Sequence, residues 1–332
     1  MRKKIIFMLL VVFMLLAACS KDEEKREESG QSISPLTGIS GNENVDDRIV
    51  GVMVNNHPKA RPQSGLSKAD IVFEVLAEGK ITRFLALFQS EKPDMVGPVR
   101  SAREYYFELA NGYDALYVYH GAANFVNDMI DERRIEHIDG ALHDNDGNLF
   151  KRESFRQAPH NSYLQFAAVY DEAEAKGYDI KQDYQALPFM KKSDKITGEP
   201  AYRATIAYAT NGQNTVTFDY DEENETYKRF NDQQQTVELD SEEPVQVSNV
   251  FIIATGHEII DDEGRRAVDL ESGGDAYLLQ KGKIRKVGWE NREGRIVPVK
   301  DGQTIGFVPG KTWVNIIPAD PGIEQSVTIS NE

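Results

Sequence analysis

The chain contains a single cysteine, Cys19, among its 332 residues. One thiol cannot form a disulfide within the chain or a zinc site built from thiolates. Any fold of this chain is therefore held without covalent cross-links. If Cys19 is itself modified, no thiol remains for catalysis.

The first residues have the layout of a secretory signal peptide. Three basic residues (Arg2, Lys3 and Lys4) precede twelve consecutive apolar residues at 5–16. Twelve residues rise only about 18 Å as a helix, which is too short to cross a bilayer permanently. We predict that residues 1–18 are an export signal.

The sequence Leu16-Ala17-Ala18-Cys19 is similar to a lipobox, where the signal is cleaved before the cysteine and the thiol receives a diacylglycerol. A thiolate is a strong nucleophile, and two acyl chains are needed because one gives only marginal membrane binding. Lipidation of Cys19 is therefore predicted, with membrane lipid as a partner and the outer face of the membrane as the location. The alternative is an ordinary signal followed by a chance cysteine.

The chain is acidic. Loss of the three basic signal residues would change the formal net charge from −16 to −19. Nucleic acids and anionic membrane surfaces require a basic footprint, so no nucleic acid partner is expected. The length fits about two domains.

Residues 19–44 are predicted to be the lipidated cysteine and a disordered acidic tether. The run from Lys21 to Gly30 is charged and offers almost nothing to bury. Such a composition cannot compensate the entropy of ordering.

An α/β domain, a mixed sheet with flanking helices, is predicted for residues 45–180. Strands are expected at 49–54, 71–76, 81–88 and 115–119, the second and third joined as a hairpin across Glu78-Gly79-Lys80. Helices are expected at 101–110, with Ser101 as N-cap, and at 122–133 and 162–176.

A second, mostly antiparallel β domain is predicted for residues 200–330. Its β-rich runs are separated by turn signals such as Asn211-Gly212, Lys281-Gly282 and Asp301-Gly302. Trp289 and Trp313 lie in these runs, and core packing is a commoner role for them than stacking on a sugar.

Polar residues of the first domain gather at the expected ends of strands and helices, where ligands bind in open α/β sheets. Near 100–103, two arginines flank a helix start that already carries partial positive charge, so a negative group is expected nearby. It is either an internal carboxylate such as Glu74 or Glu104, or a bound anion. The predicted ligand-binding residues are Asn55, Asn56, Arg61, Arg83, Arg100, Arg103, Arg156, His160 and Asn161.

Evidence for catalysis is weaker. No G-x-S-x-G or S-x-x-K signature occurs. His120, His160 and Glu74 are the catalytic candidates, with either histidine as general base. A zinc site from His57, His120 and His160 is not favoured because no pair has a metal-binding spacing, and neither a metal nor another cofactor is expected.

Several motifs together resemble the YerB lipoproteins of Gram-positive bacteria. They are the run Val-Met-Val-Asn-Asn-His-Pro-Lys-Ala-Arg-Pro-Gln-Ser-Gly-Leu at 52–66, Ala-Asp-Ile-Val-Phe-Glu at 69–74, Gly-Pro-Val-Arg-Ser-Ala-Arg at 97–103, Ala-Pro-His-Asn at 158–161 and Gly-Lys-Thr-Trp-Val at 310–314. The resemblance implies two linked domains on an exported lipoprotein, without an assigned reaction.

The leading hypothesis is an extracytoplasmic lipoprotein that binds an anionic envelope ligand, such as a cell-wall fragment or polymer. One alternative is a hydrolase or transferase acting on envelope polymers. Another is a scaffold for other envelope proteins, in which the polar residues have only structural roles.

Overall fold

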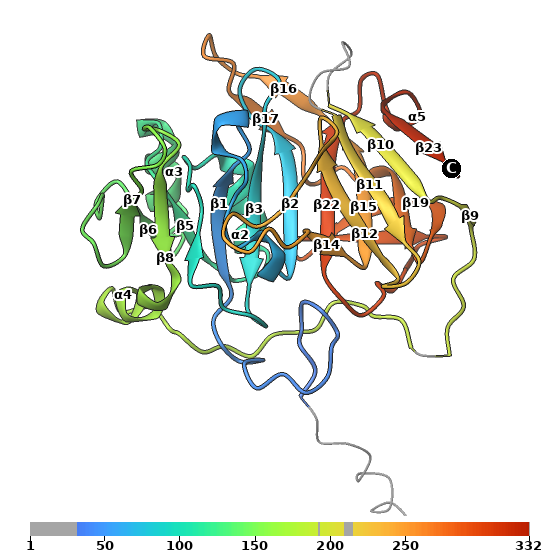
Figure 1. The fold of residues 1–332 in the computed structure, drawn as a ribbon, viewed down its shortest axis with the longest axis horizontal. Helices are drawn as coiled ribbons and strands as arrows, with labels where there is room; N and C mark the ends of the chain where they lie inside the picture. Colours follow the sequence, from blue (N-terminus) through green and yellow to red (C-terminus); the bar gives the residue numbers. More distant parts are fainter. Residues whose placement is uncertain (1–31, 192, 209–214, 332) are drawn as a thin grey trace, which may run out of the picture. The chain divides into compact units, whose positions relative to one another are not determined.

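Most of the β-rich runs join one twelve-stranded sheet (Figure 1). The computed structural model describes residues 32–191, 193–208 and 215–331. In spatial order the strands are β21 (Gln303–Thr304), β20 (Arg295–Lys300), β19 (Lys283–Arg292), β18 (Gly274–Gln280), β15 (Asn249–Thr255), β22 (Thr312–Pro318), β2 (Ile71–Leu76), β3 (Thr82–Phe88), β1 (Val50–Asn55), β5 (Leu116–Tyr119) and β6 (His137–Asp139), with β9 (Glu199–Pro200) paired to β19.

The sheet is continuous across both halves of the chain because β22 lies between β2 and β15 and is parallel to both. The β1–β3 and β2–β3 pairs are antiparallel, and β5 and β6 are parallel to β1. It follows that β1, β2, β5, β6, β15 and β22 run in one direction. Their carboxyl ends share one edge of the sheet, called here the carboxyl edge, and their amino ends share the amino edge.

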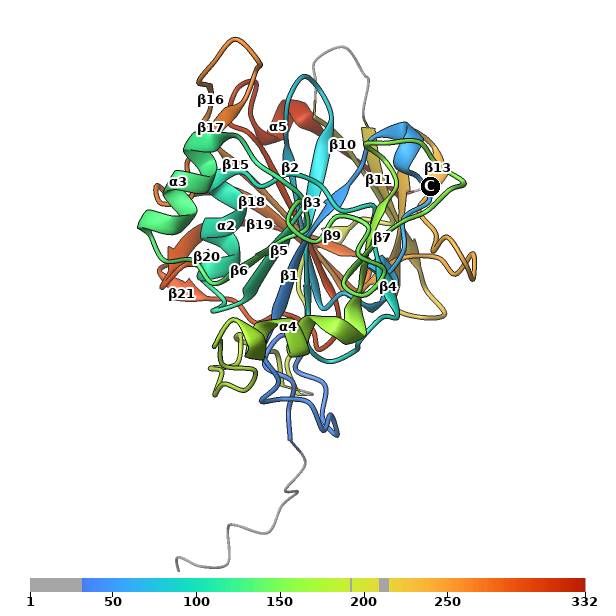
Figure 2. The ribbon, with the colours of Figure 1, turned by 90° about the vertical axis from the view of Figure 1, so that its left-hand side faces the viewer.

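Both faces of the sheet are covered, since alternate side chains of each strand point to opposite faces. Helices α2 (Glu104–Asn111) and α3 (Asn124–Glu132) cover one face, where Tyr106 and Phe107 pack with Phe73 and Leu85. A six-stranded sheet covers part of the other face: β13 (Gln234–Gln235), β12 (Thr226–Asn231), β11 (Thr215–Asp221), β10 (Arg203–Ala207) and β23 (Val327–Ser330), with β14 (Gln246–Val247) on β12. Figure 2 shows the helices and the smaller sheet on opposite sides.

Short elements complete the fold. A three-stranded sheet is formed by β4 (Met95–Val96), β8 (Ser162–Gln165) and β7 (Phe150–Arg152), and a hairpin by β16 (His257–Ile259) and β17 (Arg266–Val268). The remaining helices are α4 (Val169–Ala175), α5 (Ile323–Ser326) and the 3-10 turns η1 (Pro58–Ala60), η2 (Leu66–Lys68) and η3 (Phe166–Ala168).

The predicted fold class is confirmed: a mixed sheet with few helices is followed by mostly antiparallel strands. The hairpin across Glu78-Gly79-Lys80 is present as β2 and β3. The predictions for the export signal, for Cys19 and for the tether as far as residue 31 lie outside the described residues.

The tether prediction is wrong for the residues just after 32. Leu36 is buried, the carbonyl of Pro35 accepts a hydrogen bond from the Leu187 amide, and that of Thr37 accepts one from Gly310. Ile33–Glu332 is one compact unit. The sequence could not predict these contacts, because the run up to residue 30 is charged and the partners of Pro35 and Thr37 lie far along the chain.

Two helix predictions need correction. The segment predicted as a helix at 162–176 begins as strand β8, because Ser162 and Leu164 pair with β7, and only Val169–Ala175 is α-helical. Helix α2 begins at Glu104 with Arg103 as N-cap, not Ser101. The Arg100 amide donates to the carbonyl of Met53 in β1 and the Ala102 amide donates to that of Gly121 in the loop after β5, and these hydrogen bonds keep the preceding residues outside the helix.

Among residues 32–191, 193–208 and 215–331, no helix has the length and apolar character needed to cross a lipid bilayer.

Candidate anion-binding site

The segment around Arg100 crosses the carboxyl ends of two neighbouring strands, β1 and β5. The backbone amide of Asn55 donates to the Pro98 carbonyl. The backbone amide of Arg100 donates to the carbonyl of Met53 in β1, 3.0 Å away. The carbonyl of Arg100 accepts from the amide of His120, the residue after β5. Tertiary hydrogen bonds thus fix the backbone that carries the Arg100 side chain.

Two histidines from distant loops stack beside this segment. The rings of His57 and His160 have centroids 4.5 Å apart and planes inclined by 25°. The side chain of Asn55 joins both loops: its Oδ1 accepts from the His57 amide at 2.9 Å, and its Nδ2 lies 2.9 Å from His160 Nδ1.

These hydrogen bonds determine where the imidazole protons lie. Because Asn55 Oδ1 already accepts from a backbone amide, Nδ2 is the atom that faces His160 and donates to its Nδ1. The Nδ1 of His57 likewise accepts, from the Lys59 amide at 3.1 Å. In their neutral forms both rings therefore carry the proton on Nε2, which leaves two N–H donors.

Burial and the positive surroundings both favour the neutral form of the two rings. Burial, then repulsion from Lys59 and Arg100, lowers the pKa of His57 below its usual value. Burial, then His57 and Arg100, lowers the pKa of His160. The histidines thus contribute donors to the site, and Arg100 contributes charge.

Two further arginines and one carboxylate lie near Arg100. Glu78 forms ion pairs with Arg83, at 2.6 Å, and with Arg103. Burial alone would raise the pKa of Glu78, but the attraction of the two arginines outweighs it and lowers the pKa. Arg100 has no carboxylate partner among the described residues, and its Nη1 contacts only the Pro159 carbonyl, at 3.4 Å. Burial and repulsion from Arg83 and Arg103 lower the pKa of Arg100 to about 10, so it remains a cation at neutral pH.

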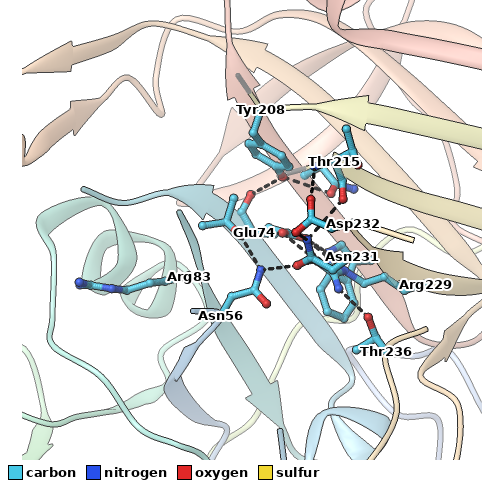
Figure 3. A network of polar contacts seen from close by, with 12 residues as sticks. Asn56, Glu74, Arg83, Tyr208, Thr215, Arg229, Asn231, Asp232 and Thr236 are labelled. Atoms are coloured by element: carbon cyan, nitrogen blue, oxygen red, sulfur yellow. Dashed lines mark hydrogen bonds and ion pairs between the residues drawn. The ribbon is translucent and has the colours of Figure 1, made fainter. Parts of the chain in front are cut away.

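The other face of the sheet holds a buried polar network that joins the two halves of the chain (Figure 3). Glu74 is fully buried, and both its oxygens lie 2.9 Å from Nη2 of Arg229, which is 1% exposed. Thr82 and Trp313 also donate to Glu74. Figure 3 shows Arg83 pointing away from this network. The carboxylate of Glu74, a predicted catalytic candidate, is therefore fully used within the core.

Asn56 and Arg61, both predicted to bind ligand, belong to the same network. Asn56 Nδ2 donates to Thr82 and to Asn231. Arg61 donates to the carbonyl of Asn56 and lies 3.3 Å from Asp232. The alternation of strand β1 explains the separation, since Asn55 and Asn56 lie on opposite faces of the sheet.

Arg156 and Asn161 hold loops. Arg156 donates to the Ala60 carbonyl and to the Tyr163 hydroxyl, and Asn161 accepts from Arg152 at 2.8 Å. The structure therefore brings Asn55, Arg83, Arg100, Arg103 and His160 together, and uses Asn56, Arg61, Arg156 and Asn161 in internal contacts.

His120 lies apart from the stacked pair. Its Nε2 is 3.2 Å from Asp144, and its ring contacts Phe150 edge-on. In the described part of the chain no group of three His, Cys, Asp or Glu side chains is arranged to hold a metal ion.

Sequence reasoning missed the residues of the second domain that hold the loop after β1. Asn231 and Asp232 contact Asn56 and Arg61, and both oxygens of Glu238 accept from amides of Gly65 and Ser67. One signal was available: Arg229 lies at an inward position of a strand with alternating burial, where an arginine needs a partner.

The fold and site define a class of protein in which an α/β domain and a mostly antiparallel β domain share one sheet, with a basic site at its carboxyl edge. The chain belongs to the DUF3048 family, described as proteins of unknown function. The model of its N-terminal domain matches residues 36–179, and that of its C-terminal domain matches residues 204–314.

A similar sequence and a similar solved structure agree with this assignment. The chain is 48% identical over 287 residues, 86% of each sequence, to a Bacillus subtilis (strain 168) protein named "Putative lipoprotein YerB". The crystal structure of YerB from Bacillus subtilis has a TM-score of 0.83 and 45% identity, and the match covers 90% of this chain and 100% of that one. The resemblance to the YerB lipoproteins is confirmed, and the name of the relative supports the lipoprotein class.

Proposed function

We propose that this chain is an extracytoplasmic lipoprotein, anchored through Cys19 to the outer face of a Gram-positive cytoplasmic membrane, that binds an anionic group of an envelope ligand. The ligand is a cell-wall fragment or polymer, and the site consists of Arg100, His57 and His160. The Leu16-Ala17-Ala18-Cys19 motif and the name of the Bacillus subtilis relative support the anchor.

One observation carries the binding proposal: Arg100 is half-buried, cationic and without a carboxylate partner in the described chain, while Glu78 pairs with both other arginines. A partly desolvated cation flanked by two more cations is costly unless a negative group compensates it. An anion accepting from Arg100 and from the two Nε2–H groups would do so.

The protonation pattern favours binding over catalysis. A general base needs a free lone pair on its imidazole. The Nδ1 of His160 already accepts from Asn55, and its Nε2 carries the proton. Glu74 is sequestered by Arg229. The hydrolase or transferase alternative would require His160 to change tautomer and lose the Asn55 hydrogen bond.

The proposal predicts that Arg100→Ala abolishes retention of the protein on purified cell-wall sacculi. The readout is the fraction of protein that sediments with sacculi at low and high salt, since bonds to an anion weaken as salt rises. The melting temperature should change little, because the Arg100 side chain makes one long hydrogen bond.

Arg203→Ala is the matched control. It also removes one arginine charge, but Arg203 lies on β10 and forms an exposed ion pair with Asp219 of β11. It should leave retention unchanged. Equal loss in both variants would indicate non-specific charge attraction. A fall of several degrees in the melting temperature of Arg100→Ala alone would instead favour the scaffold alternative, in which Arg100 is structural.

A further inference from the structure

A cavity of about 880 Å³ lies at the carboxyl edge, and its lining does not include Arg100, His57 or His160. Leu76 ends β2, Pro318 ends β22 and Gly256 follows β15, and all three residues line the cavity. These three parallel strands are adjacent in the sheet. Crevices beyond the carboxyl ends of such strands are the usual ligand sites of α/β sheets, and the volume suits an organic molecule.

The cavity is lined by both apolar and charged side chains. Its apolar surface comes from Leu76, Ala207, Tyr208, Pro318 and Pro321. Its charged groups are the cations Lys80 and Arg266 and the carboxylate of Asp320. A ligand that fits this surface has apolar parts and ends of opposite charge.

The two charged sides differ in how they are held. Arg266 is fixed by donating through Nε to the Ala77 carbonyl and through Nη2 to the Gly79 carbonyl, at 3.1 and 3.2 Å. Its Nη1 makes no hydrogen bond within the described chain. Asp320 is exposed and has no hydrogen bond or ion pair in the same described part. A rigid donor and a free acceptor therefore line one cavity.

His257 adds a hydrogen-bond acceptor. Burial, with a smaller contribution from Arg266, lowers its pKa to about 4, so the ring is neutral. Its Nδ1 donates to the Thr255 carbonyl at 3.0 Å, which leaves a lone pair on Nε2. That Nε2 is buried and has no partner among the described residues. A buried acceptor without a partner destabilises the fold, and a ligand N–H would satisfy it.

We propose that this cavity binds a short peptide with free termini. Arg266 and Lys80 bind its terminal carboxylate, Asp320 binds its terminal ammonium, and His257 accepts from a backbone N–H. The apolar lining takes small apolar side chains. A free peptide and a peptide released from an envelope polymer share this chemistry and differ in stereochemistry, because wall peptides contain D-residues.

The test is calorimetric titration of the purified full-length protein with tri-alanine, in all-L and all-D forms. Saturable binding of either form is expected, and the preferred form identifies the source. N-acetyl-tri-alanine amide, which lacks both charges, should bind about tenfold more weakly. Saturation-transfer NMR on the same samples detects weak binding that calorimetry misses.

Asp320→Asn should weaken tri-alanine about three- to fivefold, as expected for an exposed ion pair. Asp301→Asn, an exposed carboxylate in the turn between β20 and β21, is the matched control and should bind normally. Absence of binding by both forms at millimolar concentration, or equal affinity for capped and free peptide, would overturn the proposal. Arg100→Ala should not affect this titration. The peptide-binding proposal is therefore tested independently of the anion-binding site.

Discussion

Asn55 links the backbone of one loop to the imidazole of another. Its amide orientation is set by the His57 N–H, and that orientation assigns the tautomer of His160. Protonating His160 on Nδ1 would place two donors against each other. The lowered pKa of His160 and its hydrogen bond to Asn55 thus both correspond to a neutral ring.

We expect His57 and His160 to titrate below the usual value near 6.5. Their folded-state pKa values are depressed, so their contribution to stability is present above that pH and is lost as the pH falls through the folded values. Inorganic phosphate should raise both pKa values, since an anion favours the imidazolium. Nitrogen-15 NMR of the imidazoles, with Asn55→Ala for comparison, measures the tautomers and the titration. A protonated Nδ1 on His160 at pH 7 would contradict the assignment.

The contribution of Asp70 to stability has the opposite pH dependence. Burial raises its pKa to about 6, although the Gln89 and Ser90 amides and the Ser90 hydroxyl donate to it. Because the folded-state value exceeds the unfolded one, the contribution to stability is complete at low pH and is lost as the pH rises through about 6.

Asp70→Asn should therefore be tolerated at pH 5 and stabilising at pH 7. The asparagine oxygen can accept from both amides, and its Nδ2 can donate to Ser90. Urea unfolding at both pH values measures the effect. Greater destabilisation at pH 7 than at pH 5 would show that the carboxylate form is the favoured one.

At this scale, the sequence indicates which residues lie near the ends of strands. Asn55 is the last residue of β1 and Arg100 lies in a loop that contains Gly97 and Pro98, so both could be placed at a strand end. Asn56 could not be separated from Asn55, because a shift of one residue changes the face of the sheet. Arg156 could not be assigned to its loop contacts, since its partner Ala60 is far away in sequence.

Among the elements, β2 and β12 are coupled by the ion pair of Glu74 with Arg229. The guanidinium also lies over the rings of Trp313 and Phe84, with its carbon 4.7 and 5.1 Å from the ring centroids. Two strands from different sequence domains thus share one buried charge pair.

Removing either partner alone should cost about 3–5 kcal/mol of the free energy of unfolding, because the remaining charge stays buried. The double replacement of Glu74→Leu with Arg229→Met should cost clearly less than the sum of Glu74→Leu alone and Arg229→Met alone. A double-mutant cycle by urea unfolding measures the coupling. The exposed pair of Arg203 and Asp219 is the control, and its loss should cost under about 1 kcal/mol. Additive single effects at Glu74 and Arg229 would contradict the coupling.

Elements with strong periodicity were predicted correctly, including β1, β2, β3, β5 and α3. The segment at 162–176 was not, because local propensity favours a helix while pairing with β7 and β4 imposes strand β8. The sequence carries no local mark of those distant partners.

For the whole molecule, the shared sheet makes the two family domains interdependent. Strand β22, from the second domain, lies between β2 and β15 and pairs with both. Its first residue, Thr312, is opposite Ile71 of β2 and Asn249 of β15. Separating the domains would expose the backbone edge of β2 and the chain around Glu74.

A fragment containing only residues 36–179 should therefore fail to form a native structure. The measurement is amide dispersion in a proton–nitrogen NMR spectrum, with calorimetry of the intact protein, for which one cooperative transition is expected. A fragment that unfolds cooperatively with its own melting temperature would show that the domains are independent.

The sequence predicted two consecutive domains, and the class of each is confirmed. It did not predict that they share a sheet, because a parallel pair between β2 and β22 joins residues more than half the chain apart. Buried strands of either domain look alike in sequence whichever strand lies beside them.

The first described residues enter the fold at the amino edge, where Thr37 bonds to Gly310 just before β22, whereas Arg100 and the cavity lie at the carboxyl edge. Strand β1, six residues long, spans about 20 Å between these edges. The described residues that follow residue 32 therefore join the sheet at the edge opposite Arg100 and the cavity, separated from them by the full length of β1.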